Sequence, residues 1–323
     1  MSDIDPTLPD AADITHAGFA AIIGAPNAGK STLTNLLVGT KVAIVTHKVQ
    51  TTRFPIRGVA HHNAAQIVLV DTPGIFRAKK RLDRAMVKAA WSGAEESDAV
   101  VHLIDASAWV AVLAGDANSA QKLSVEDDKR VMETLKENGQ QAYLALNKID
   151  LFPHDQVLPI MAEMNAENVY EEIFMISALN GDGVPPLLEK LAGKMPQGPA
   201  LYPPEQTADL PMRLLAAEVT REKLMLRLHQ ELPYQLMVET ETWEPFENGS
   251  VRIRQAVIIA REQHKGMVLG KGGSAIKAIG KASREDLEEM LGQKVHLFLF
   301  VKVDPKWMER REAYQSVGLE FDA

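Results

Sequence analysis

The strongest constraint on the fold is the stretch Gly-Ala-Pro-Asn-Ala-Gly-Lys-Ser at residues 24–31. An apolar run, FAAII, precedes it and an amphipathic run, STLTNLL, follows it, so the stretch joins a strand to a helix. Its glycines let the backbone bend sharply, and successive N–H groups beside a helix N-terminus form a cradle for phosphate oxygens. The pattern GxxxxGK[ST] in this setting predicts a loop that binds a nucleotide phosphate chain. We call residues 24–31 the phosphate loop.

The residues of the phosphate loop have distinct expected roles. Lys30 should bridge the β- and γ-phosphates, and the Ser31 hydroxyl should bind Mg²⁺. The glycines and their neighbours should contribute main-chain N–H groups. The predicted nucleotide contacts are Gly24, Ala25, Pro26, Asn27, Ala28, Gly29, Lys30, Ser31 and Thr32.

A second motif, Asp71-Thr72-Pro73-Gly74, ends the apolar run AAQIVLV. This position places Asp71 at the carboxyl edge of a strand, facing the phosphate loop, where it would hold Mg²⁺ through a water molecule. The N–H of Gly74 would sense the γ-phosphate. The sequence therefore predicts nucleotide contacts from Asp71, Thr72, Pro73 and Gly74.

The polar stretch between these motifs is typical of a mobile switch. It contains Gln50, Thr51, Thr52 and Arg53. One threonine hydroxyl should complete the Mg²⁺ shell when a triphosphate is bound, and Thr52 is preferred to Thr51. The predicted Mg²⁺ ligands are Ser31, Thr52 and Asp71. The predicted catalytic residues are Lys30, Thr52 and Gly74.

A third motif, Asn147-Lys148-Ile149-Asp150, follows another strand and predicts the choice of base. Guanine presents an N1–H and an exocyclic amine side by side, so the Asp150 carboxylate can accept both hydrogen bonds. Adenine lacks this pair of donors and would leave the acid unpaired. Asn147 would brace the loop, and the Lys148 stem would cover the base. Further contacts, including an N–H to guanine O6, are expected from Ser177, Ala178 and Leu179. The predicted substrate is GTP.

Short apolar runs alternate with longer amphipathic stretches through this part of the chain. Strands are expected at residues 19–24, 42–45, 64–71, 99–106, 142–148 and 172–178. Helical spacing of apolar residues separates them. This order predicts a doubly wound α/β fold with a mostly parallel sheet, covered by helices on both faces.

The chain is long enough for two domains. Residues 196–211 contain five prolines and no apolar periodicity, which is typical of a linker. We therefore expect a disordered tail at residues 1–16, a nucleotide domain at 17–195 and a second domain at 212–323 that ends in a helix. The second domain follows the order α-β-β-α-β, which predicts a small α+β fold.

The second domain contains a GxxG loop, Gly270-Lys271-Gly272-Gly273, at the start of a helix. From Arg261 to Arg284 there are six Lys or Arg residues against one acid, Glu262. Basic side chains suit phosphate contacts, and apolar neighbours can receive bases. The predicted RNA contacts are Arg261, Lys265, Met267, Val268, Gly270, Lys271, Gly272, Gly273, Ser274, Ile276, Lys277 and Lys281.

Composition narrows the remaining classes of function. The absence of cysteine excludes disulfide scaffolds, thiolate zinc sites and cysteine nucleophiles. The N-terminus lacks a secretory pattern, and no apolar run approaches ~18 residues, so we expect a cytoplasmic protein. The formal charge is −8, but residues 212–323 balance 17 Lys and Arg against 17 Asp and Glu. The excess of acid therefore lies in the first two thirds of the chain.

Taken in order, these motifs resemble the Era type of P-loop GTPases, over Phe19–Met195 for the G domain. The GxxG loop, the α-β-β-α-β order and the segment EVTREKLMLRLHQELPY resemble a type II KH domain. The resemblance implies binding to the 3′ end of small-subunit (16S) ribosomal RNA and assistance in 30S subunit assembly, gated by GTP and Mg²⁺. Some members of the family also contact the inner membrane peripherally. We expect a monomer.

Two positions bear on hydrolysis within this family. Ile75 follows DTPG where Ras-like enzymes carry a water-orienting glutamine, so another group must position the nucleophile. Asn27 matches the asparagine that holds K⁺ in potassium-stimulated relatives, or it tolerates a left-handed backbone. Departures from the family pattern are Phe54-Pro55 after TTR, a long segment at residues 107–128 and a GKGG loop without a second lysine.

Two other functions fit parts of the sequence. A membrane-associated signalling GTPase would not act on the ribosome. An RNA-binding adaptor would have little GTPase activity. The intact nucleotide motifs argue against the adaptor, and the basic GxxG region argues against the signalling protein.

Overall fold

The computed structural model describes residues 10–228 and 232–323. Its contacts divide the chain into two units. The first comprises the described residues up to Ala43, Thr52–Asp209 and Asp322–Ala323; the second comprises Ile44–Thr51 and Leu210–Phe321. Most of the predicted N-terminal tail, residues 1–9, lies outside the described residues. Residues 208–209, inside the predicted linker, form strand β7, and the domain boundaries themselves stay a prediction.

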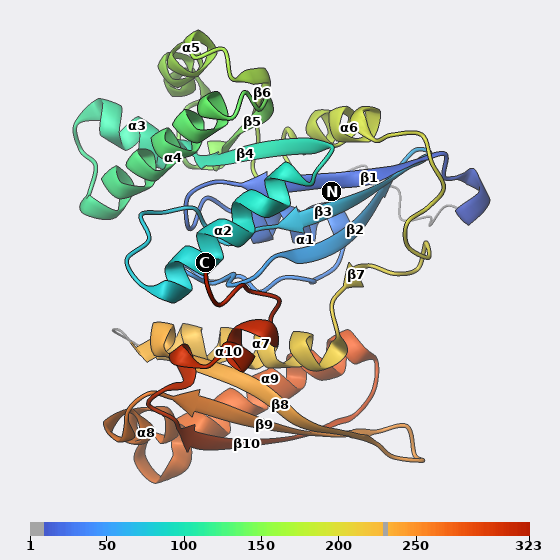
Figure 1. The fold of residues 1–323 in the computed structure, drawn as a ribbon, viewed down its shortest axis with the longest axis vertical. Coiled ribbons are helices and arrows are strands. Elements are labelled where there is room, and N and C mark those ends of the chain that lie inside the picture. Colours follow the sequence, from blue (N-terminus) through green and yellow to red (C-terminus); the bar gives the residue numbers. More distant parts are fainter. Residues whose placement is uncertain (1–9, 229–231) are drawn as a thin grey trace. The chain divides into compact units, whose positions relative to one another are not determined.

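Among the described residues, seven strands form the sheet of the first unit, in the order β6-β5-β4-β1-β3-β2-β7 (Figure 1). Their bounds are β1 His16–Ile23, β2 Ile56–His62, β3 Ala65–Asp71, β4 Ala99–Asp105, β5 Ala142–Asn147, β6 Tyr170–Met175 and β7 Ala208–Asp209. The strands from β6 to β3 run parallel, and β2 and β7 are antiparallel to their neighbours. The predicted doubly wound, mostly parallel sheet is confirmed.

Helices cover both faces of this sheet because successive strand residues point to opposite sides. From β1, Ala20 and Ile22 join one apolar core, whereas Ala21 and Ile23 join the other. The helices of the first core are α1 Lys30–Val38 and α6 Val184–Lys194. Those of the second are α2 Arg81–Glu95, α3 Ala106–Ala114, α4 Ser119–Glu137 and α5 Leu158–Ala166.

The prediction of a strand at residues 42–45 is wrong, and the strand between α1 and β3 is β2, at Ile56–His62. The Asn35 side chain of α1 accepts hydrogen bonds from the N–H groups of Val42 and Ala43, both at 2.9 Å, and donates to the Ala43 carbonyl at 2.8 Å. It thus occupies backbone groups that a strand would pair. Strand β2 instead forms a hairpin with β3, and its turn contains Asn63 at φ 52°.

In the described part of the second unit, three strands form a sheet in the order β10-β9-β8. The elements are α7 Met212–Arg227, β8 Leu236–Pro245, β9 Val251–Ile259, α8 Glu262–Leu269, α9 Ser274–Leu291, β10 Val295–Val303 and α10 Arg311–Gln315. Apolar residues of α7, α9 and the strands form its core. The predicted α+β fold is confirmed; the GxxG loop leads into α9, and a further short helix, α8, precedes it. Among the helices of the described ranges, none is long and apolar enough to span a membrane.

Candidate nucleotide site and nucleic-acid interface

The phosphate loop leaves the end of β1 and turns directly into α1. Gly29, the N-cap of α1, has φ 107°, a left-handed conformation that favours glycine. A Cβ atom at Gly29 would lie 2.3 Å from Nδ2 of Asn147. Asn27 also has a left-handed backbone, at φ 64°. This agrees with the interpretation that asparagine is present because it tolerates such a conformation. Its interpretation as a K⁺ ligand stays a prediction.

Lys30 is the first residue of α1, near the end of the phosphate loop, and its side chain is buried. Its Nζ donates hydrogen bonds to the carbonyls of Gly24, at 3.1 Å, and Ala25, at 2.9 Å. Burial lowers the pKa of Lys30 to about 8, and the carboxylates of Asp71 and Asp128 oppose this shift. Lys30 therefore remains mostly cationic at pH 7.

Three oxygen-bearing side chains meet beside Lys30. The Ser31 hydroxyl donates to Oδ2 of Asp71 at 2.7 Å, and the Thr52 hydroxyl lies 2.9 Å from Ser31 Oγ and 3.3 Å from the same Oδ2. Burial raises the pKa of Asp71 to about 6, while hydrogen bonds from Ser31 and Thr52 and the charge of Lys30 oppose it. Among the described residues, Oδ1 of Asp71 has no hydrogen-bond partner although it is buried.

This cluster fits a hard divalent cation. Carboxylate and hydroxyl oxygens are the ligands that Mg²⁺ prefers, and a buried carboxylate oxygen without a hydrogen bond retains a lone pair for a metal or its water. The hydroxyl of Thr51, the alternative ligand, bonds to other partners than Ser31 and Asp71. It donates to the carbonyl of Lys48 at 2.7 Å and lies 2.6 Å from the Thr46 hydroxyl.

The DTPG motif is tied to the phosphate loop through the backbone. The Thr72 hydroxyl donates to the carbonyl of Ile22 at 2.7 Å, and the N–H of Ile75 donates to the carbonyl of Gly24 at 3.0 Å. Gly74 approaches the loop so closely that a Cβ atom would lie 2.8 Å from Cγ of Pro26. Ile75 packs into the core, so its side chain does not reach the nucleotide site.

The residues predicted to select the base converge at the ends of β5 and β6. Asn147 donates to the carbonyl of Ala28 at 2.7 Å and accepts from the N–H of Ala178 at 2.9 Å, so it braces two loops. Lys148 lies 2.5 Å from Oδ2 of Asp105. The Asp150 carboxylate and the Leu179 side chain are exposed, whereas Ser177 is buried.

Sequence reasoning missed two carboxylates at this site. Asp105 caps the N-terminus of α3 and holds Lys148. Asp128, on α4, accepts a hydrogen bond from the N–H of Ala25. Asp105 ends a strand, which is a usable signal. Asp128 lies within an ordinary charged helix pattern, and only the fold shows its burial.

The GxxG loop joins α8 to α9 and exposes most of its predicted contacts. Gly270, Gly272 and Gly273 have φ of 71°, 60° and 78°. Met267 is 56% exposed, and Lys271 and Lys277 are also exposed. Val268 is 0% exposed because it packs beneath the loop in the core of the unit. Its predicted contact with RNA bases is therefore wrong.

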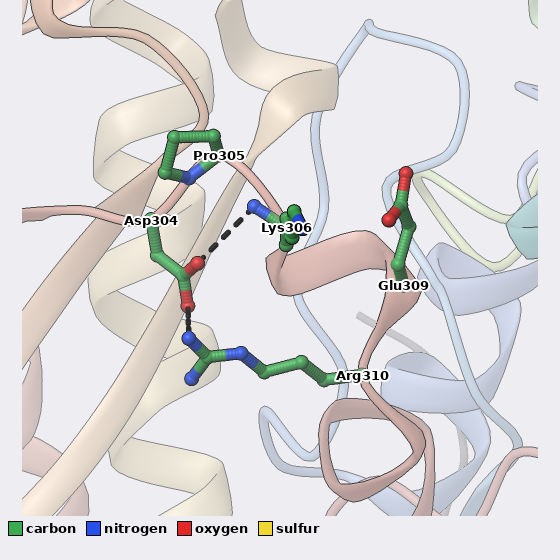
Figure 2. Close-up of a pocket in the computed structure, with 5 residues that line it drawn as sticks. All are labelled: Asp304, Pro305, Lys306, Glu309 and Arg310. Atoms are coloured by element: carbon green, nitrogen blue, oxygen red, sulfur yellow. Dashed lines mark hydrogen bonds and ion pairs between the residues drawn. The ribbon is translucent and has the colours of Figure 1, made fainter.

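A pocket of about 350 Å³ follows β10 and is lined by Asp304, Pro305, Lys306, Glu309 and Arg310. Figure 2 shows the Asp304 carboxylate bonded to two neighbours. The N–H of Lys306 donates to it at 3.1 Å, and Arg310 lies 2.9 Å from it. Its charge is therefore compensated internally, and the pocket includes none of the predicted site residues.

Comparison with known proteins matches both units to families. Residues 19–148 match the family described as 50S ribosome-binding GTPase, and residues 231–308 match the KH domain. GTPase Era of Maricaulis maris is 61% identical over 307 residues, which cover 95% of this chain and 98% of the relative. GTPase Era of Caulobacter vibrioides is 54% identical over 315 residues, covering 98% and 100%.

Solved structures give the same result. The crystal structure of a single-residue variant of Aquifex aeolicus Era bound to GDP·AlF4⁻ has a TM-score of 0.84 and 37% identity, covering 94% of this chain and 99% of that one. A structure of Era with MgGDPNP and nucleotides 1506–1542 of 16S ribosomal RNA has a TM-score of 0.84 and 36% identity, with the same coverage.

The fold and the site define a P-loop GTPase that carries a type II KH domain. A GTPase of this class converts GTP and water to GDP and phosphate. The relatives match nearly the whole chain with more than half of the aligned residues identical, and the protein belongs to the Era family of GTPases.

Proposed function

We propose that the protein is a GTP-driven switch that binds the 3′ end of 16S ribosomal RNA and assists assembly of the 30S subunit. One observation carries the proposal: the likeness to an Era structure with MgGDPNP and 16S RNA nucleotides extends over 94% of the chain. The exposed, basic GxxG loop is the surface expected to hold the RNA backbone. Neither alternative, a signalling GTPase or an adaptor, accounts for likeness in both units.

In the nucleotide site, Ser31, Thr52 and Asp71 would hold Mg²⁺. The metal would neutralise charge that develops on the phosphate oxygens during hydrolysis. Lys30 already carries positive charge beside the loop carbonyls and would transfer its hydrogen bonds to the β- and γ-phosphates. The N–H groups of the loop and of Gly74 would hold the phosphate oxygens. Asn147 bonds to Ala28 of the phosphate loop and to Ala178 of the predicted base-binding segment, so it would hold the two segments at a fixed separation.

Residues 44–51 supply a physical basis for switching. By their contacts they belong to the second unit, although Thr52, the next residue, lies beside Ser31 and Asp71. The N–H of Val45 donates to Glu222 of α7 at 2.9 Å. Lys48 donates to the carbonyls of Met225 and Leu228 at the end of α7. A change at Thr52 on hydrolysis would pull on this segment.

The proposal is tested by binding of a fluorescent RNA with the 3′-terminal sequence of 16S RNA. We expect tighter binding with GDPNP than with GDP, and no effect of the adenine nucleotides ADP and AMPPNP. Equal RNA affinity with GDPNP and GDP would disprove the switch. Equal affinity for an unrelated RNA of the same length would disprove the target.

Other properties expected from the family stay predictions. They are stimulation by K⁺ at Asn27, a cytoplasmic location, peripheral contact with the inner membrane and a monomeric state. Replacing KCl by NaCl in a GTPase assay tests the first of these.

A further inference from the structure

The carboxylate of Asp128, on α4, is buried against the first residues of the phosphate loop. Its side chain is 1% exposed. Oδ1 accepts a hydrogen bond from the N–H of Ala25 at 3.4 Å, and Oδ2 accepts one from Nε1 of Trp109 at 3.0 Å. A buried carboxylate is costly unless its lone pairs have partners, so these contacts determine where it lies.

A polar row behind Asp128 crosses the apolar core. Nε2 of His102, on β4, lies 3.7 Å from Oδ1 of Asp128, and its Nδ1 lies 2.8 Å from the Tyr170 hydroxyl. Burial raises the pKa of Tyr170, so the phenol keeps its proton at neutral pH. The distance from His102 to Asp128 is longer than a hydrogen bond, so the row places polar groups behind the carboxylate without bonding to it.

Ala25 is held from two sides. Asp128 accepts from its N–H, and its carbonyl accepts from Nζ of Lys30 at 2.9 Å. The negative charge of Asp128 also opposes the effect of burial on the pKa of Lys30. The same carboxylate thus fixes the start of the loop and favours the charged form of its lysine.

We propose that Asp128 is a positioning residue for the nucleotide, which holds the Ala25 amide so that the phosphate loop keeps its binding shape before GTP arrives. This inference rests on the proposed role of residues 24–31 in phosphate binding. A loop that is already ordered loses less conformational freedom on binding, so affinity is higher. It also gives a role to the end of the long segment at residues 107–128.

The test compares full-length variants in fluorescent GDP binding and GTPase kinetics. Asp128→Ala should weaken GDP and GTP binding about tenfold, the effect expected for one hydrogen bond to a charged group. KM should rise by a similar factor while kcat changes less than about threefold, since the contact is present in ground and transition states alike. Val125→Ala, a buried apolar change on the same helix, should lower thermal stability without changing affinity.

A rescue experiment separates positioning from general packing. Asp128 uses a different oxygen for each contact, whereas asparagine has an acceptor oxygen at only one of these positions and an NH2 donor at the other. Asp128→Asn therefore cannot satisfy both the Ala25 N–H and the Trp109 Nε1–H in the same geometry. Removing the competing donor with Trp109→Phe should restore part of the lost GDP affinity in the double variant. Such coupling between contacting residues is measured by the double-mutant cycle.

Each outcome decides between the assignments. Lys30→Ala serves as the reference for the phosphate loop itself. If Lys30→Ala loses GDP binding and Asp128→Ala does not, the positioning role is disproved and the loop assignment stands. If Lys30→Ala binds GDP normally, the loop assignment fails first. Should Asp128→Ala not fold, Asp128→Asn decides, and a double variant weaker than Asp128→Asn disproves the inference.

Discussion

At the scale of single residues, Asp71 shows that a functional side chain can lower stability. Burial raises its pKa to about 6 from an ordinary 3.8. Between these values the folded protein binds more protons than the unfolded chain, so the contribution of Asp71 to stability falls as pH rises through this window. Above pH 6 the protein carries a buried carboxylate whose Oδ1 has no partner among the described residues.

We therefore expect Asp71→Asn to raise the stability of the metal- and nucleotide-free protein at pH 7.5, by on the order of 1–2 kcal/mol. The gain should be much smaller near pH 4.5, where the native carboxyl is protonated while that of the unfolded chain is still partly ionised. GTP hydrolysis should be lost. Urea unfolding in EDTA at both pH values measures the effect, with the exposed Asp116→Asn as control. A gain of equal size at both pH values would contradict the explanation.

Asp150 allows a test of base choice without a cost in stability, because its side chain is exposed. Asp150→Asn leaves one acceptor for the two guanine donors and sets an amide N–H against the other. GTP affinity should fall about a hundredfold, because one charged hydrogen bond is lost and the other becomes neutral. Xanthosine triphosphate, which carries a carbonyl in place of the amine, should bind the variant better than GTP does. Unchanged GTP affinity would remove Asp150 from the base site.

At the scale of elements, the GxxG loop offers a matched pair of substitutions. A Cβ atom at Gly272 would meet nothing within 4 Å, and its φ of 60° is tolerated by Asp and Asn. Gly272→Asp places a negative charge where RNA phosphates are expected, so RNA affinity should fall more than about tenfold. Gly272→Asn, its neutral counterpart, should lose much less. Fluorescence anisotropy at fixed salt measures both, and equal losses would argue against phosphate contact.

The elements that the sequence predicted well are those whose geometry is tied to a motif. The strand and helix around residues 24–31 follow from what a phosphate cradle requires, and Asp71 and Asn147 follow from strand ends. The sequence alone could not exclude a strand at residues 42–45, because this short apolar run has the composition of a buried strand. Only the fold places Asn35 against the backbone of Val42 and Ala43.

Strand β2 escaped notice for the opposite reason. Its sequence IRGVAHH contains a glycine and ends in two histidines, so it lacks the composition of a buried strand. Pairing with β3 overrides that weak propensity. Similarly, the KH pattern locates the GxxG loop but does not tell which neighbours point outward, so it places Val268 on the surface although the residue lies in the core.

At the scale of the whole molecule, residues 44–51 belong to the second unit by their contacts. This grouping predicts a variant that loses nucleotide control of RNA binding but still binds GTP and RNA. Lys48→Ala removes the hydrogen bonds to the end of α7. We expect the ratio of RNA affinities with GDPNP and GDP to approach one, while GTP affinity and RNA affinity with GDP stay near those of the native protein. Lys190→Ala, which removes an exposed ion pair with Glu172, is the control. An unchanged ratio would show that the segment does not carry the signal.

Residues 44–51 also limit where the protein can be truncated. A fragment that stops at the proline-rich stretch would retain residues 44–51 but lose α7, whose Glu222 and C-terminal carbonyls bind them. Val45 and Val49, already more than a third exposed, would lose that support. Such a fragment should be nicked by proteases within this segment much faster than the intact chain, so an excised GTPase half is a poor substitute for the whole enzyme in kinetic work.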